Sequence, residues 1–193
     1  MRRLIVGITG ASGAIYGIRA LQMLQASGGI ETHLVVSASG LRTIIEETDH
    51  SPAEVKAMAD VVHEQRDLGA SIASGSFQTS GMLVAPCSVK TLSGIAHCYD
   101  SELTVRAADV CLKERRPVVL LFRETPFHAG HIALMEQATR NGAIVMPPVP
   151  AFYFRPRSLD EVVDQTVARA LSLFGIEIAS MHRWKDADPA RTN

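Results

Sequence analysis

Two short segments of small and hydroxyl-bearing residues each follow an apolar run and are suited to binding an anion. Thr9-Gly10-Ala11-Ser12-Gly13 follows the apolar residues 4–8, and Pro86-Cys87-Ser88-Val89-Lys90-Thr91 also follows an apolar run. A strand that turns at once into a helix leaves backbone N–H groups free at the positive end of the helix, where they attract a phosphate or another anion. Small residues let a ligand approach that backbone closely. One such segment is equally compatible with a purely structural turn, but two of the same kind favour a ligand site.

A pair of opposite charges ends the apolar segment 117–122. Arg123 and Glu124 follow directly, and Thr125-Pro126 comes next. In α/β sheets the carboxyl ends of strands are where ligand sites are built. Beside an apolar ligand surface the pKa of the Glu124 carboxyl would be raised, which would suit it to general acid or base chemistry. The alternative is a structural ion pair between the two side chains.

Other polar side chains give weaker signals. Arg106 and Lys113 are seven residues apart in a predicted helix and so share one face, which is more often a solvated stripe than a phosphate site. Ser12 is either a helix-capping hydroxyl or a hydrogen-bond partner for a ligand, because no GxSxG nucleophile motif occurs. No dense carboxylate cluster offers Mg²⁺ a site, so we expect metal-independent chemistry. Spacing does not choose among three further arginines that could meet a phosphate, Arg155, Arg157 and Arg169.

Strand-length apolar segments alternate with helical patterns along the chain. We expect strands at 3–9, 32–37, 82–87, 117–123 and 143–147, with a weaker one at 70–74. We expect helices at 13–27, 39–47, 52–65, 89–97, 102–116, 129–141 and 159–174. This alternation with short connections predicts an α/β, Rossmann-like (flavodoxin-like) three-layer fold with a central parallel sheet and helices on both faces. The small-residue segments and Arg123-Glu124 all fall at carboxyl ends of strands, where ligands bind in such folds.

The composition indicates one domain and excludes several function classes. We expect residues 1–180 to form a single domain, followed by a tail at 181–193. A net charge of −1 argues against nucleic-acid or membrane-surface binding, and no apolar run approaches a membrane span. Three cysteines without CxxC spacing indicate reduced thiols in a cytoplasmic protein. The 47% hydrophobic content is compatible with buried contacts between subunits.

Two segments near the C-terminus break the regular pattern. Residues 146–154 are rich in proline and aromatic residues, so they cannot form a central strand. They either cover the core or form a subunit contact that also offers an aromatic side chain to a ligand. The polar tail contains the only tryptophan, Trp184, which needs a surface to pack against. We expect this tail to close over the active site.

Taken in order, these motifs resemble those of the UbiX-like flavin prenyltransferases. That family includes the small B subunits once called aromatic acid decarboxylases. The resemblance extends from the first strand through Trp184, and the segments that carry it are 10–13, 86–91, 105–110, 113–114, 123–126 and 146–153. Each motif alone is modest, but the ordered set is specific.

The resemblance implies a homododecameric flavoprotein that transfers a dimethylallyl group from dimethylallyl phosphate to N5 and C6 of reduced FMN. The product, prenylated FMN, would serve a UbiD-type decarboxylase. The FMN site of the family maps onto Gly10, Ala11, Ser12, Ser37, Ser88, Val89, Lys90, Thr91 and Arg123. The dimethylallyl phosphate site maps onto Arg106, Lys113, Tyr153 and Arg169. Val89 departs from the pattern, because relatives commonly have methionine there.

The resemblance also implies catalytic roles for Ser12, Glu47, Lys113, Glu124 and Trp184. The cationic side chains and Tyr153 would hold the leaving phosphate, and Trp184 would shelter positive charge on the allyl group. Glu124 would carry a proton, with Ser12 as a relay, and Glu47 is linked to the phosphate and proton transfers. Two alternatives remain open: an FMN-dependent decarboxylase that acts directly on its substrate, and a non-enzymatic flavin carrier.

Overall fold

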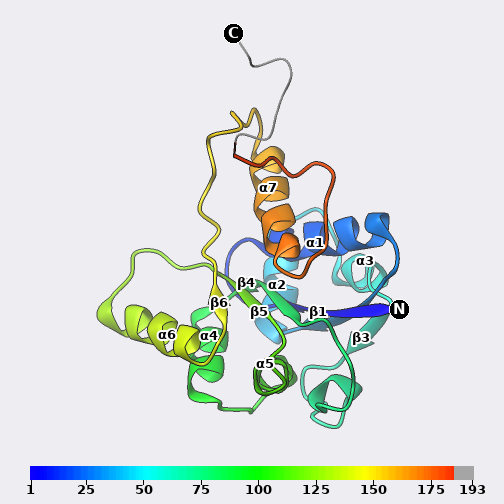
Figure 1. The fold of residues 1–193 in the computed structure, drawn as a ribbon, viewed down its shortest axis with the longest axis vertical. Helices are drawn as coiled ribbons and strands as arrows, with labels where there is room; N and C mark the ends of the chain where they lie inside the picture. The colour runs from blue at the N-terminus through cyan, green and yellow to red at the C-terminus, as the bar shows by residue number, and fades with distance from the viewer. Residues whose placement is uncertain (185–193) are drawn as a thin grey trace.

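A six-stranded sheet forms the centre of the protein. The computed structural model describes residues 1–184, and within them every strand is parallel to its neighbours in the order β3-β2-β1-β4-β5-β6 (Figure 1). The strands are β1 (Arg2–Ile8), β2 (Ile30–Val36), β3 (Val61–His63), β4 (Met82–Cys87), β5 (Val118–Phe122) and β6 (Ile144–Val145). The central strands read as continuous apolar runs because helices bury both of their faces.

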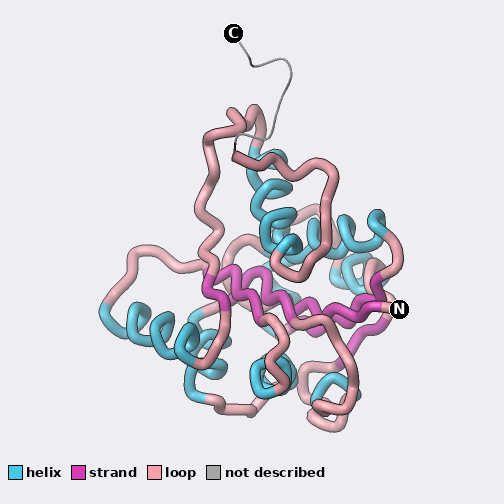
Figure 2. The backbone as a smooth tube through the Cα atoms, in the orientation of Figure 1, coloured by secondary structure: helices cyan, strands magenta, loops and turns pink. Residues whose placement is uncertain are grey.

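Helices cover the sheet on both sides, which confirms the predicted three-layer α/β fold (Figures 1 and 2). They are α1 (Ala14–Ser27), α2 (Ala38–Glu47), α3 (Pro52–Ala57), α4 (Val89–His97), α5 (Leu103–Lys113), α6 (Ala129–Arg140) and α7 (Leu159–Ser172). One core cluster joins α1, α2, α3 and α7 to the sheet, and a second joins α4, α5 and α6 to the other face. Successive side chains of β1 alternate between them, since Leu4 lies in the first cluster and Ile5 in the second.

The order of the strands reverses between β1 and β4. The chain builds β1, β2 and β3 toward one edge of the sheet and β4, β5 and β6 toward the other. Connections therefore leave β1 and β4 on opposite sides, which opens a crevice at their carboxyl ends. The segments that follow Ile8 and Cys87 meet at this crevice.

The helix expected at 52–65 is wrong beyond its first two turns. Helix α3 ends at Ala57, and the edge strand β3 follows at Val61–His63. Asp60 explains the early end of the helix, because its carboxylate accepts hydrogen bonds from the backbone N–H and the hydroxyl of Thr32 on β2, at 2.7 and 2.9 Å. This contact between distant segments draws the chain into the sheet, and a local pattern does not reveal it.

The weaker strand expected at 70–74 is also wrong. Residues Ser71–Ala73 form one turn of 3₁₀ helix, in which Ile72 is buried in the core and Ala73 packs against it. The last predicted strand, 143–147, is shortened to Ile144–Val145. Pro147 and Pro148 lack the N–H groups that would continue the ladder. After β6 the chain leaves the sheet as a long loop that leads to α7 (Figure 2). Residues 185–193 of the expected tail lie outside the described residues.

Candidate active site

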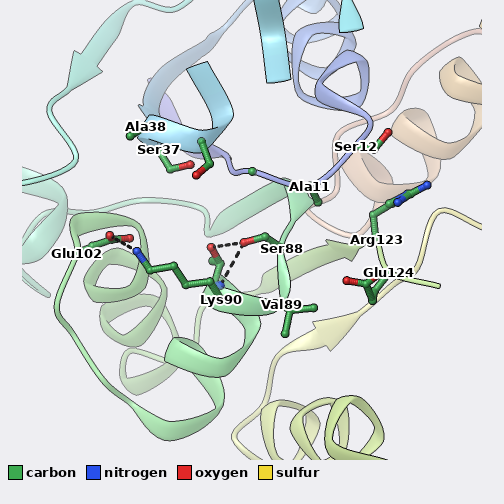
Figure 3. A pocket seen from close by; sticks show the side chains of 13 residues that line it. Ala11, Ser12, Ser37, Ala38, Ser88, Val89, Lys90, Glu102, Arg123 and Glu124 are labelled. Carbon is green, nitrogen blue, oxygen red and sulfur yellow. Dashed lines mark hydrogen bonds and ion pairs between the residues drawn. The ribbon is translucent and has the colours of Figure 1, made fainter. Parts of the chain in front are cut away.

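A cavity of about 420 Å³ lies at the crevice between β1 and β4. Its lining comes from the segments after β1, β2, β4 and β5 and from the start of α5. The lining residues are Gly10, Ala11, Ser12, Ser37, Ala38, Ser39, Ser88, Val89, Lys90, Thr91, Glu102, Arg123 and Glu124 (Figure 3). All nine residues that the resemblance assigned to FMN therefore surround one cavity.

Thr9 joins the two small-residue segments beneath this cavity. Its buried hydroxyl donates to the Pro86 carbonyl at 2.7 Å and accepts from the Ser88 N–H at 2.9 Å. The Thr9 N–H also donates to the Pro86 carbonyl, at 3.2 Å. One side chain thus fixes the end of β1 against the end of β4, where a proline cannot donate to the sheet. Thr9 opens the first of the two segments predicted from the sequence, but no role was predicted for it.

Two helices begin at the cavity with serine caps. Ser37 Oγ accepts from the Gly40 N–H at 3.0 Å, and Ser88 Oγ accepts from the Thr91 N–H at 3.3 Å. In each case the serine oxygen occupies one backbone donor and leaves the positive end of the helix turned toward the cavity. The sequence analysis identified both serines, and it identified Ser37 only through the resemblance.

The N-terminus of α1 already holds a carboxylate of the protein itself. Glu47 Oε2 accepts from the N–H groups of Gly13 and Ala14, at 2.7 and 3.4 Å. Gly13 adopts φ 102°, which allows the turn, and a Cβ there would lie 2.9 Å from the Tyr16 ring. We expected an external anion at these two N–H groups, but they donate to Glu47, the last residue of α2. Glu47 is not among the residues that line the cavity.

A positively charged and a negatively charged side chain lie at each end of the cavity. Lys90 Nζ pairs with Glu102 Oε1 at 2.5 Å at one end, and Arg123 and Glu124 lie with Ser12 at the other (Figure 3). The hydrogen bond from Lys90 holds the pKa of the Glu102 carboxyl below its usual range. Glu124 Oε1 accepts from the Thr125 N–H at 2.9 Å. Within residues 1–184, Arg123 and Glu124 form no ion pair with each other, so the purely structural alternative for this pair is not realised.

The residues assigned to dimethylallyl phosphate lie away from this cavity in two other places. Tyr153, Arg169 and Trp184 line a separate cavity of about 410 Å³. Lys113 and Arg106 lie on α5, where Lys113 pairs with Glu114 at 2.5 Å. Arg106 pairs with Asp100 and Asp109, at 3.0 and 3.2 Å. A single chain therefore does not gather the four donor-site residues.

Three further residues that line the cavity between β1 and β4 were not predicted from the sequence. Ala38 and Ser39 follow the Ser37 cap in the first turn of α2, and their place after a strand is a signal that would have found them. Glu102 precedes α5 in a polar segment and carries no such signal. Arg155 and Arg157, which spacing left undecided, line a different cavity beside α7. Among residues 1–184 no group of three His, Cys, Asp or Glu side chains is placed to hold a metal ion.

Comparisons with known proteins place this geometry in a family. A model of the family described as Flavoprotein matches residues 1–171. The flavin prenyltransferase UbiX of Escherichia coli K12 is 60% identical over 97% of this chain and 100% of its own length.

Solved structures agree with this match. A crystal structure of AnUbiX in complex with FMN and dimethylallyl pyrophosphate has a TM-score of 0.94 at 45% identity and covers 97% of this chain and 99% of its own. The dodecameric FMN-dependent UbiX-like decarboxylase of E. coli O157:H7 has a TM-score of 0.92 at 47% identity and covers 95% of this chain and 99% of its own. The chain therefore belongs to the flavoprotein family and, within it, to the UbiX flavin prenyltransferases.

Proposed function

We propose that this protein is a flavin prenyltransferase that transfers a dimethylallyl group from dimethylallyl phosphate to N5 and C6 of reduced FMN. The observation that carries the proposal is the coincidence of nine predicted flavin residues around one cavity, in a chain 60% identical to a flavin prenyltransferase over the whole of that relative. Its proposed product is prenylated FMN, and we propose a UbiD-type decarboxylase as the recipient.

The cavity has the donor set that a flavin mononucleotide requires. Serine and threonine hydroxyls, two helix N-termini and the cations of Lys90 and Arg123 suit a phosphate ester and the polar edge of a flavin. A Cβ on Gly10 would lie 2.2 Å from Ser39 Cβ. Only glycine therefore lets the chain at position 10 pack this closely against Ser39 in the cavity wall. The nine lining residues named above would hold the cofactor, which in its reduced form supplies the nucleophilic nitrogen and carbon that receive the allyl group.

On the donor side, the residues present favour loss of a phosphate. Arg106, Lys113 and Arg169 would neutralise negative charge on the departing group, and Tyr153 would contact it from the cavity that it shares with Arg169. The indole of Trp184 would face positive charge on the allyl carbons, an attraction of roughly 0.5–2 kcal/mol. Most of the rate would come from holding the two reactants in line, which can contribute about 7–11 kcal/mol.

Glu124 is the residue placed to move a proton. Closing the ring joins the far allyl carbon to C6, so one proton adds to the allyl double bond and one leaves C6. Glu124 lies at the same end of the cavity as Ser12 (Figure 3). We propose that Glu124 and the retained phosphate carry these two protons, and that the Ser12 hydroxyl relays them. Glu47 would support the relay from behind the turn, through its bonds to the Gly13 and Ala14 N–H groups.

The proposed function is tested by anaerobic incubation with reduced FMN and either dimethylallyl monophosphate or the diphosphate, followed by mass spectrometry of the flavin. We expect a flavin species of higher mass, and the two donors show which phosphate the site prefers. Activation of a purified UbiD-type apo-decarboxylase by the reaction mixture tests the recipient. Unchanged FMN together with release of CO₂ from an aromatic acid would instead identify a decarboxylase, and unchanged FMN alone a carrier.

A further inference from the structure

We propose that Gln165 on α7 is a positioning residue that fastens residues 181–184 to the body of the protein and thereby sets Trp184 beside Tyr153 and Arg169. The catalytic consequence rests on the proposed function, because it concerns the dimethylallyl phosphate side of the site. The fastening itself is a structural claim that can be measured without turnover.

The amide of Gln165 pairs with the backbone of His182 in both directions. Gln165 is only 6% exposed. Its Nε2 donates to the His182 carbonyl at 2.8 Å, and its Oε1 accepts from the His182 N–H at 2.9 Å. A side-chain amide is the neutral group that presents a donor and an acceptor side by side, as a neighbouring strand would. Gln165 thus gives an isolated backbone segment the pairing that it lacks.

Tyr153 closes this pair into a ring of hydrogen bonds. The second N–H of Gln165 donates to the Tyr153 hydroxyl at 2.9 Å, and that hydroxyl donates to the His182 carbonyl at 2.8 Å. Both protons of the amide and the proton of the phenol are therefore used, and the His182 carbonyl accepts twice. A polar network in which every proton has a partner holds its members in one arrangement, and Gln165 at its centre is buried. Tyr153, which we assign to the phosphate, and the C-terminal segment are set by the same side chain.

Aromatic contacts extend the fastening toward Trp184. The His182 ring stacks on Phe154, with centroids 5.0 Å apart and planes 11° apart. The Trp184 ring meets Tyr153 edge to face, with centroids 5.7 Å apart. Phe154 is 9% exposed whereas Trp184 is 69% exposed, so the segment is anchored at residue 182 and presents its indole to the surface. Arg169 lies one helical turn after Gln165, on the same face of α7.

An apolar residue at position 165 would fill the space but release the segment. The His182 N–H and carbonyl and the Tyr153 hydroxyl would each lose a partner, and each such hydrogen bond contributes about 0.5–1.5 kcal/mol net. Rehydration of these groups would require the segment to move away from α7. We therefore expect Gln165→Leu to free Trp184 and to leave the FMN cavity intact. No residue that lines the FMN cavity also lines the cavity of Tyr153, Arg169 and Trp184.

Fluorescence anisotropy of the single tryptophan reports this fastening directly. In the purified full-length protein with FMN bound, we expect Gln165→Leu to lower the anisotropy of Trp184. We also expect it to raise the KM for dimethylallyl phosphate by about tenfold with an unchanged Kd for FMN, since the loss of one net hydrogen bond corresponds to that factor. Thr166→Val is the matched control, because Thr166 is equally buried and, within residues 1–184, its hydroxyl bonds only to Val162 of the same helix.

Gln165→Glu supplies a second variant that keeps the shape of the side chain. A carboxylate cannot donate to the His182 carbonyl, whereas a protonated carboxyl offers an O–H and a C=O much as the amide does. We expect the Trp184 anisotropy of this variant to approach the wild-type value at low pH and to fall as pH rises. Wild type and Thr166→Val should stay level over the same range. A level profile for Gln165→Glu, or unchanged anisotropy in Gln165→Leu, would overturn the proposed fastening.

The two proposals fail in distinguishable ways. If the wild-type protein forms no heavier flavin, the proposed function is wrong and the anisotropy still decides the role of Gln165. If Gln165→Leu frees Trp184 but leaves the donor KM unchanged, the positioning role in catalysis is overturned.

Discussion

At the scale of single residues, Glu102 is the unexpected member of the flavin cavity. It places a carboxylate 2.5 Å from Lys90 in a site that we assign to a phosphate ester. Because Lys90 is then partly neutralised, we expect Glu102→Gln to bind FMN more tightly, by roughly two- to fivefold, the scale of an exposed ion pair. Gln65 can still donate to the substituted side chain, as it does to Glu102 at 2.9 Å, so the local structure should be kept.

Riboflavin is the control ligand for this substitution, because it lacks the phosphate. Titration monitored by quenching of flavin fluorescence should show a gain for FMN, a steeper salt dependence and no gain for riboflavin. An equal gain for both flavins would mean that Glu102 acts through the shape of the cavity rather than through its charge.

Glu124 is the second residue whose role can be isolated. Replacement by glutamine keeps the size of the side chain and its acceptor for the Thr125 N–H, but removes the base. We expect Glu124→Gln to allow the first bond to the allyl group and to slow the closing of the second. Mass spectrometry of quenched time points, combined with absorption spectra, separates the two stages. Product formed at the wild-type rate would exclude this role.

At the scale of elements, the junction of β1 and β4 depends on Thr9. Thr9→Val keeps the shape of the side chain but leaves the Ser88 N–H and the Pro86 carbonyl short of a partner. We expect a loss of about 1–3 kcal/mol in the free energy of unfolding and weaker FMN binding, because Ser88 caps α4 at the cavity. Thr32→Val is the control: this hydroxyl is also buried and also donates and accepts once, with Asp60, but it lies near the amino end of β2 and does not line the cavity. It should lower stability similarly without changing the Kd for FMN.

The alternation of elements and most of the flavin cavity could be predicted from the sequence, and the reasons are local. Small residues after apolar runs mark the ends of parallel strands, so the turns at Gly10 and Ser88 were visible without coordinates. What could not be predicted depends on contacts between distant segments. The strand β3 exists because Asp60 binds Thr32, and a strand of three residues has too little pattern to compete with the helix formers before it. Gln165 and Glu102 likewise acquire their roles from partners far away along the chain.

At the scale of the whole molecule, the pH dependence of stability should reflect the edge of the sheet at β3. His33 Nε2 faces the Glu31 carboxylate at 2.8 Å and so donates to it; His33 Nδ1 then accepts from His63 Nε2 at 2.9 Å. Burial, followed by the neighbouring His33, lowers the pKa of His63 below its usual value. As pH falls, His63 therefore takes up a proton in the unfolded chain before it does so in the folded protein. The free energy of unfolding decreases as pH falls through the ordinary histidine range near 6.5.

His63→Gln retains a donor toward His33 but does not titrate. Melting temperatures measured from pH 7.5 to 5.5 should fall for the wild type and fall less steeply for this variant. Parallel slopes would show that other groups account for the pH dependence.

One chain keeps apart the residues that we assign to the donor site, since Lys113 lies on α5 whereas Tyr153, Arg169 and Trp184 line a cavity beside α7. Lys113 on α5 is not among the residues that line the cavity of Arg169, Tyr153 and Trp184, and neither Lys113 nor Arg169 lines the flavin cavity. Val149 and Phe152, in the loop before α7, are 74% and 72% exposed. Apolar side chains exposed to this extent on one loop favour a contact with another protein chain. The E. coli O157:H7 relative is described as dodecameric. We therefore propose that neighbouring subunits complete the donor site.

Lys113→Ala and Arg169→Ala should each be inactive as pure proteins, but should recover part of the activity when co-expressed, because some sites then receive one intact residue from each parent. Differently tagged subunits, purified in tandem, make the mixed assembly accessible to the mass-spectrometric assay. Recovery of activity requires sites built from two chains, and mixed assemblies as inactive as their parents would place both residues in the site of one chain.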